Sequence, residues 1–343
     1  MRRRRLPILV VLLALAAAIA VGFYYWRKGP PEAVRLLPES DAVMYVDFGL
    51  LRRAGVFERM GPVSEEPEYQ RFVAESGFRF ERDLDEAAIA VHAPPAGPPG
   101  GESRYSEVLV GRLDVARATA WLRHVAAHTE RYKNLDIFSI PHEGRTVRVA
   151  LLGANLAAAS NTESDQPIHR IVDNYRRPAL PSRGPSLVRE RYQRLPAASL
   201  VWVMARVAGA GTPGVTTPSL VHDLAPGALL VGSLRWAGDV QVRLEAETVN
   251  EGQARQIAAN VEAWLVVFRA LEANVQLAGS DADVKAAFDS LHVELEGNRV
   301  RLGVDVPLGV LKKVAATPPA VAPPESKRQA PEKPAPSKPA RRR

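Results

Sequence analysis

Two stretches of the chain are alike: EGRTVRV at residues 143–149 and EGNRVRL at residues 296–302. Each opens on a Glu-Gly pair, which is typical of a tight hairpin turn, and continues as a strand in which apolar and basic residues alternate. Strands joined by such short turns pair in antiparallel sheets. The two stretches therefore predict antiparallel strands and favour a unit that occurs twice.

The elements before the two hairpins follow one order, three strands and then a long helix. The first unit has expected strands at 42–48, 87–91 and 107–113 and a helix at 115–129; the second has strands at 199–207, 228–234 and 240–247 and a helix with Ile257, Val261, Leu265, Phe268 and Leu271 on one face. Similar hairpins also arise by chance in a chain of this length, but the shared order favours a diverged duplication. We predict the α+β class, with antiparallel sheets and helices packed on one face.

The N-terminus has the pattern of a membrane anchor. Arg2–Arg5 precede the apolar run Leu6–Gly22, and the aromatic residues Phe23–Trp26 follow it. About 21 apolar residues, at 1.5 Å rise per residue, span the ~30 Å hydrocarbon core of a bilayer. The basic cluster predicts a cytoplasmic N-terminus and the aromatic cluster the far interface. The alternative is a cleaved signal peptide that ends at Ala18-Ile19-Ala20. Both interpretations export the rest of the chain.

Proline content and apolar periodicity divide the chain into six segments. These are a signal-anchor at 1–28, a stalk at 29–35, an α+β repeat at 36–177, a Pro-rich joint at 178–196, a second repeat at 197–314 and a basic Pro/Ala/Lys-rich tail at 315–343. The tail has no apolar periodicity, so we expect it to be disordered.

The positive charge lies at the two ends of the chain. The formal net charge is +7, but residues 1–28 and 317–343 together carry +11, which leaves about −4 on the body between them. A nucleic-acid-binding domain shows its basic residues on the folded surface, so we do not expect nucleic acid as a partner. The chain has no cysteine, which excludes disulfides, zinc–thiolate sites and iron–sulfur clusters.

No catalytic, metal-binding or cofactor-binding motif stands out. His124 and His128 have the spacing of two ligands on one helix face, but the glutamate of the metalloprotease pattern is missing after His124. Asp136, Ser139 and His142 are the residue types of a nucleophilic triad, but Ser139 lies in a predicted strand without a glycine-flanked turn. We therefore predict no cofactor and a chain that is not an enzyme.

Four arginines of the two hairpins are the candidate binding residues. Arg145 and Arg148 lie in the first hairpin, and Arg299 and Arg301 in the second. We expect their side chains on one sheet face, where they would bind an anionic partner. The alternative is that they cover the solvent face of a half-exposed sheet.

Three segments resemble uncharacterised single-pass envelope proteins of bacteria such as acidobacteria. They are LPESDAVMYVD at 37–47, DIFSIPHEGRTVRV at 136–149 and AASNT at 158–162. The resemblance implies an inner-membrane protein with the bulk of the chain in the periplasm. That family has no assigned activity, so the resemblance transfers no functional residue.

The sequence thus favours a membrane-anchored, non-enzymatic envelope protein whose exported α+β part binds another envelope component, either a protein, a lipid or an anionic polymer. Two alternatives remain open. One is an exported hydrolase with a site assembled from dispersed residues. The other is a carrier whose sheet and helices enclose an apolar ligand.

Overall fold

The computed structural model describes residues 29–53, 55, 66–92, 104–177, 184–207, 227–274, 282–307 and 309–310. The predicted signal-anchor at 1–28 and the predicted tail at 315–343 lie outside these residues. Among the helices that the structure describes, none is both long enough and apolar enough to cross a bilayer.

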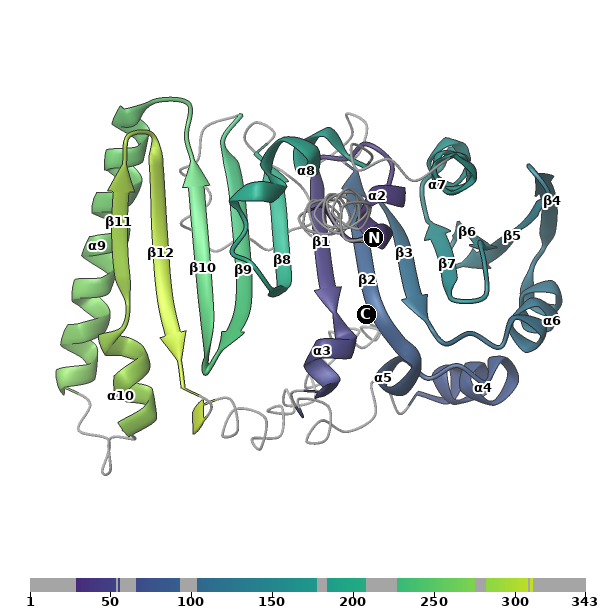
Figure 1. Cartoon of the computed structure of the whole chain (residues 1–343), viewed down its shortest axis with the longest axis horizontal. Helices are drawn as coiled ribbons and strands as arrows, with labels where there is room; N and C mark the ends of the chain where they lie inside the picture. Colours follow the sequence, from purple (N-terminus) through teal and green to yellow (C-terminus); the bar gives the residue numbers. More distant parts are fainter. Residues whose placement is uncertain are drawn as a thin grey trace, which may run out of the picture.

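The described strands form a twelve-stranded antiparallel sheet (Figure 1). In chain order they are β1 (Ala42–Asp47), β2 (Leu84–His92), β3 (Arg104–Gly111), β4 (His128–Tyr132), β5 (Leu135–His142), β6 (Arg145–Leu151), β7 (Leu156–Ser160), β8 (Ser199–Arg206), β9 (Leu229–Ala237), β10 (Asp239–Glu247), β11 (His292–Glu296) and β12 (Arg299–Val306). The α+β class and the antiparallel pairing predicted from the sequence are confirmed.

The strand order shows how the two predicted units combine. It is β11-β12-β10-β9-β8-β1-β2-β3-β7-β6-β5-β4, so the first strands of the two units, β1 and β8, pair at the centre. In this pair Tyr45 lies opposite Trp202. From the centre each half adds three consecutive strands outwards, and after a helix its remaining strands complete the edge. The two units therefore build one sheet, not two.

The matching hairpins form as predicted but hold different places. Glu143, Gly144 and Gly297 have φ angles of 48°, 76° and 59°, the left-handed values that such tight turns require. β12 pairs directly with β10, the third strand of its unit, whereas β7 separates β6 from β3. The likeness of the two stretches thus predicts hairpins correctly but does not make β6 and β12 equivalent. A common origin of the two halves stays a prediction.

Helices cover both faces of the sheet, so the predicted one-sided packing is wrong. We name the two faces after the helices α2 and α9. On the α2 face, α2 (Glu32–Leu36) and α7 (Gln166–Arg176) cover the first half. On the same face α8 (Ser186–Arg191), followed by the short 3-10 turn η3 (Tyr192–Arg194), packs on β8 at the centre of the sheet. On the α9 face lie the helices α3 (Phe48–Arg53), α4 (Pro67–Ser76), α5 (Phe80–Asp83), α6 (Val115–Val125) and the long α9 (Glu251–Asn274). Of these, α6 packs on α4. The short helix α10 (Ala282–Asp289) contacts β12.

The physical reason is that the central strands are apolar on both sides. Ala88 and Ala90 of β2 belong to the core beneath α2, and Ala87, the residue before Ala88, belongs to the core beneath α4 and α5. Because successive side chains of a strand point to opposite faces, a strand without alternating polarity needs cover on both.

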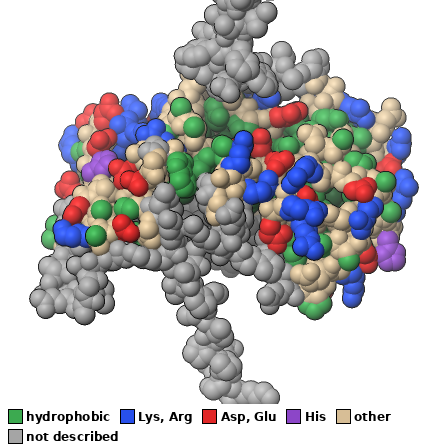
Figure 2. Space-filling model, turned by 60° about the horizontal axis from the view of Figure 1, so that its bottom comes forward, with side chains coloured by type: hydrophobic (Ala, Val, Ile, Leu, Met, Phe, Trp, Pro, Cys, Tyr) green, Lys and Arg blue, Asp and Glu red, His purple; other side chains and the backbone are tan. Residues whose placement is uncertain are grey.

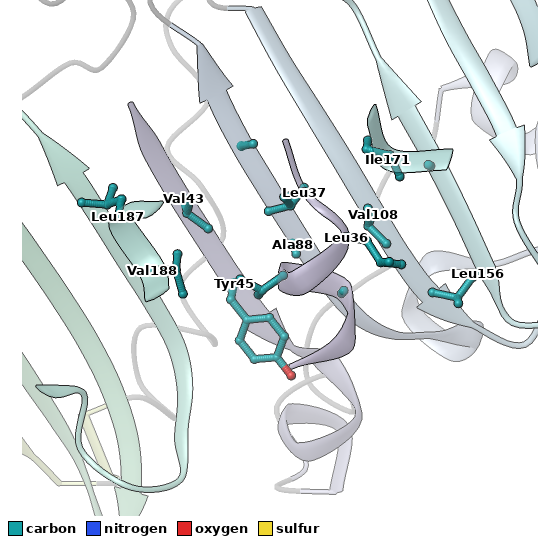
Figure 3. Packing of buried hydrophobic residues seen from close by; sticks show 14 of the residues in the cluster. Leu36, Leu37, Val43, Tyr45, Ala88, Val108, Leu156, Ile171, Leu187 and Val188 are labelled. Atoms are coloured by element: carbon teal, nitrogen blue, oxygen red, sulfur yellow. The ribbon is translucent and has the colours of Figure 1, made fainter. Parts of the chain in front are cut away.

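The main core lies under α2 (Figure 3). Leu36 and Leu37 of this segment pack over Val43, Ala88 and Val108, and Val34 is fully buried. The predicted stalk at 29–35 is therefore wrong for its second half. Pro31 is the N-cap of α2, where its fixed φ suits the start of a helix.

The predicted joint is also part of the core where it is described. Residues 178–183 lie outside the described residues, but Leu187 and Val188 of α8 are 3% and 1% exposed and pack on the first core. The prolines of this region delimit a short covering helix. They do not make the region a free linker.

Candidate binding face on strands β9 to β12

The α2 face changes character beyond β9. Leu229 and Val231 are the outermost members of the main core on this face. Farther out, the long helix α9 packs on β11 and β12 from the opposite side, where Ala246 and Val300 meet its buried residues. Polar residues and one glycine replace apolar ones on the α2 face: Gln241, Arg243, Glu245 and Glu247 of β10, Arg299, Arg301, Gly303 and Asp305 of β12, and His292, Glu294 and Glu296 of β11. We call this surface the charged face.

Arg301 stands at the centre of a carboxylate cluster. Its Nε donates to Glu245 at 3.0 Å, Nη2 to Glu296 at 3.1 Å and Nη1 to Glu294 at 3.4 Å. These interactions, first of all the hydrogen bond to Glu245, raise the pKa of Arg301 above its usual value. The charge of Arg301 is therefore already compensated within the sheet. It supports the charged face and is a poor receptor for a further anion.

Arg243 lies on β10 two residues from Glu245, on the same face, and differs from Arg301 in having no carboxylate partner in the described part of the chain. Its side chain is half-buried and makes no hydrogen bond or ion pair with any residue that the structure describes. On β9 it faces Ser233, and on β12 it faces Gly303. Because both neighbours are small, the guanidinium stands over a recess in the sheet surface.

This recess is a hollow of about 400 Å³. Its lining includes Ser233, Arg235, Gln241, Arg243, His292 and Gly303, and also the acidic residues Glu294 and Asp305. A Cβ atom on Gly303 would lie 2.4 Å from Cε1 of His292, so the glycine leaves room for this imidazole. Arg235 is held by Gln241, whose Oε1 accepts from its Nε at 2.5 Å. The hollow thus presents the guanidinium of Arg243, which has no partner among the described residues, beside Arg235 and Gln241, which hold each other. Of the two acidic residues that line it as well, Glu294 contacts Arg301.

A second hollow, of about 270 Å³, lies at the other end of β10. Arg191, Arg206 and Glu247 line it, together with Leu187 and Leu229 of the main core. Glu247 is paired with Arg191 at 3.4 Å and with Arg194. The charged face is therefore recessed at two places along one strand. Both hollows are lined by an arginine whose side chain has no partner among the described residues, but Arg206 of the second hollow is exposed, whereas Arg243 is half-buried.

The other predicted arginines do not form one surface. Arg148 donates to the backbone oxygens of Thr162 and Glu163 at 2.8 and 3.2 Å. Arg145 is three residues from it along the regularly paired β6 and so lies on the α9 face. The prediction that the four share a face is wrong for Arg145. The pattern of the first hairpin, with its two arginines an odd number of residues apart, could have shown this.

Arg148 and Arg301 share the α2 face but lie far apart. Seven strands separate β6 from β12. At about 4.8 Å per strand the two residues are roughly 38 Å apart, too far to hold one small group. On the side of the molecule that Figure 2 views, Lys and Arg side chains lie among Asp and Glu side chains.

The structure does not bring together the residues that the sequence suggested for nucleophilic catalysis or for metal binding. In β5 Ser139 points to the face opposite Asp136 and His142, because the pairing with β6 is regular. Asp136 is instead paired with Arg131 at 2.8 Å. α6 ends at Val125, so His124 and His128 do not share a helix.

The apolar face of the second long helix packs against the sheet. Ala254, Ile257, Ala258 and Val261 of α9 form a core with Val300, so these residues do not enclose a ligand.

Comparisons with known proteins give a distant likeness in fold. No family model matches the chain, and no curated protein matches it. Among solved structures the chain is similar to TP0453 in crystal form III, with 10% identity, 83% of this chain and 97% of that chain covered and a TM-score of 0.41. Crystal form IV gives 11% identity, 84% and 98% coverage and a TM-score of 0.40.

Proposed function

We propose that the chain is a non-enzymatic binding protein of the bacterial envelope and that its charged face binds an anionic group of another envelope component. The observation that carries the proposal is Arg243, a half-buried guanidinium without a partner among the described residues, over a hollow of about 400 Å³. Because no carboxylate of the described residues compensates this charge, it is available to an anionic group that enters the hollow.

The anchor completes the proposal. Residues 1–28 would hold the chain in the inner membrane with its N-terminus in the cytoplasm, so that the charged face lies in the periplasm. The membrane then supplies the first partner, and the envelope component bound at Arg243 the second. A carboxylate or phosphate group is the fitting chemistry, because a planar guanidinium binds either one through two parallel hydrogen bonds.

The test is site-specific photo-crosslinking in intact cells that express the full chain. A photoreactive residue replaces Gln241 in the hollow, and the control carries it at Arg255, an exposed position on α9. We expect an adduct that forms from position 241 only and disappears when Arg243→Glu is added.

The matched variant Arg255→Glu makes the same charge change on the other face and should leave the adduct intact. If position 241 gives no adduct, or if Arg243→Glu and Arg255→Glu reduce it equally, the charged face is not a binding site and the proposal fails.

A further inference from the structure

We infer that Glu130, Asp165 and His169 form a binding site for a divalent transition-metal ion of the zinc class. The site lies at the far edge of the sheet from the charged face, where the edge strand β4 meets helix α7. Each of the three side chains offers one ligand atom, and these atoms all lie within 4.8 Å of one another. The inference is independent of the proposed function.

The fold places the three ligands from two elements. Glu130 lies on β4 and faces α7, since it pairs with Ile137, a residue of the main core beneath this helix. Asp165 and His169 are four residues apart at the start of α7, so they lie on one side of the helix. One nitrogen and two carboxylate oxygens are a donor set that zinc and its neighbours accept.

His169 is held in a fixed orientation. Its Nε2 lies 3.0 Å from Oε1 of Glu130. The ring of Tyr132, two residues along β4 from Glu130, stacks on the imidazole with the centroids 4.0 Å apart and the planes 13° apart. Tyr132 is itself fixed, because its hydroxyl donates to Asp173 at 3.1 Å. The imidazole nitrogen is thus already turned toward the carboxylates.

Asp165 gives the second, separate observation. It occupies the N-cap position of α7, where an aspartate usually accepts a hydrogen bond from the helix backbone. Here its side chain makes no capping bond, nor any hydrogen bond or ion pair with the residues that the structure describes. Its carboxylate is placed near that of Glu130 instead. Two carboxylates beside one imidazole repel each other unless a cation joins them.

A bound ion would connect the edge of the sheet to its covering helix. β4 is the last strand of the sheet and pairs only with β5 among the described strands. Three protein ligands leave a fourth position of a tetrahedral ion for water. The structure therefore assigns the ion a clamping role between β4 and α7.

The test is isothermal titration calorimetry of the full chain, without a histidine tag, with ZnCl₂. We expect one Zn²⁺ per chain and binding weaker by roughly tenfold or more in His169→Ala and in Asp165→Asn. Asp165 is exposed and unpaired with the described residues, so Asp165→Asn should fold as well as the parent chain. His142→Ala removes an exposed histidine elsewhere and is the matched control.

Three results would overturn the inference. The first is the absence of Zn²⁺ binding by the parent chain. The second is binding that Asp165→Asn and His142→Ala weaken equally. The third is displacement of Zn²⁺ by an equal concentration of Mg²⁺. Mg²⁺ prefers oxygen ligands, so such displacement would mean that the carboxylates alone bind the ion, without His169.

Discussion

The two halves of the α2 face show what one sheet can do with two kinds of side chain. Beneath α2 and α7 the strands present small apolar residues such as Ala88, Ala90 and Ala158, which are 0–1% exposed. On β10 and β12 the corresponding face presents Arg243, Glu245 and Arg301. Both halves have the same strand order out to the third strand, so the difference lies in the side chains and in the helices that cover them.

Because of this difference, we expect the covered half to contribute mainly to stability and the charged half mainly to binding. The covered half gains its stability from burial of apolar area, at about 25 cal/mol per Å². The charged half obtains less from burial on this face, and its polar groups are instead available for pairing with one another or with a partner. Substitutions in the two halves should therefore affect different measurements.

The largest effect is expected for Trp202→Ala. Trp202 is 2% exposed, stacks on Tyr45 with the centroids 5.6 Å apart and contacts Tyr192 edge to face. Loss of the indole leaves a cavity at the junction of the two halves, and we expect the free energy of unfolding to fall by about 3–5 kcal/mol. Urea denaturation measures it. Arg243→Ala, the control from the charged half, should change it by less than about 1 kcal/mol. Equal losses of stability in the two variants would contradict the view that the apolar half supplies most of the stability.

A smaller loss is expected for Arg301→Ala. The substitution leaves Glu245, whose side chain is 11% exposed, without its cation and places it beside Glu294 and Glu296. We expect a loss of about 1–2 kcal/mol, reduced by the partial exposure of the cluster. A double-mutant cycle with Glu245→Gln should show coupling of roughly 1 kcal/mol. Additive effects would mean that the pair contributes little and that Arg301 is free to bind.

Glu107 sharpens the comparison, because it is an unpaired carboxylate among the apolar strands of the first half, on the α9 face, whereas the neighbouring Val108 lies on the α2 face. It lies on β3 between Ile89 and Ala159, makes no hydrogen bond or ion pair with the described residues, and burial raises its pKa. The folded state thus holds the proton more tightly, so stability rises as the pH falls through the raised value and is fully gained below about 4.3.

We therefore expect Glu107→Gln to stabilise the protein at pH 7, by about 1.4 kcal/mol for each unit by which the pKa is raised. The measurement is the melting temperature of both proteins between pH 7.5 and 4.5. Glu245→Gln serves as the contrast, since Glu245 is paired. A difference between Glu107→Gln and the parent chain that does not shrink as the pH falls would contradict the assignment.

The smallest effect on stability is expected for Gly303→Ala. The new methyl group would meet the imidazole of His292, which is exposed, so that the ring has to shift and its contact with the backbone oxygen of Ser290 at 2.8 Å weakens. The free energy of unfolding should change by less than about 1 kcal/mol. Because the methyl group and the displaced ring fill the hollow, the crosslink from position 241 should weaken. A crosslink of unchanged yield would show that the hollow does not receive the partner.

Local patterns predicted much of the secondary structure. The expected strand at 42–48 is β1, the strands at 199–207 and 240–247 are β8 and β10, and both Glu-Gly turns are hairpins. The helix expected at 115–129 starts where predicted, after Asp114, which accepts from the backbone of Arg117 at 3.1 Å. It ends four residues early, because His128 already pairs with Ser139 in the sheet.

The candidate sites were harder to predict than the strands. Arg301 belongs to the charged face, but its three carboxylate partners come from β10 and β11. Arg243 has no distinctive sequence pattern, since an arginine in an alternating strand is usually solvated. Glu130, Asp165 and His169 lie up to 39 residues apart and meet only because α7 folds back over β4.

The sequence by itself determined the α+β class, the antiparallel hairpins and the twofold order of elements, because turn residues and period-2 alternation act over a few neighbouring residues. Only the tertiary structure decided that β1 and β8 join the halves into one sheet, that helices cover both faces, and that Val34 is core. The reason is that burial depends on which distant segment packs on a residue. That choice is made by the whole chain at once, and the same choice leaves Arg243 without a partner among the described residues.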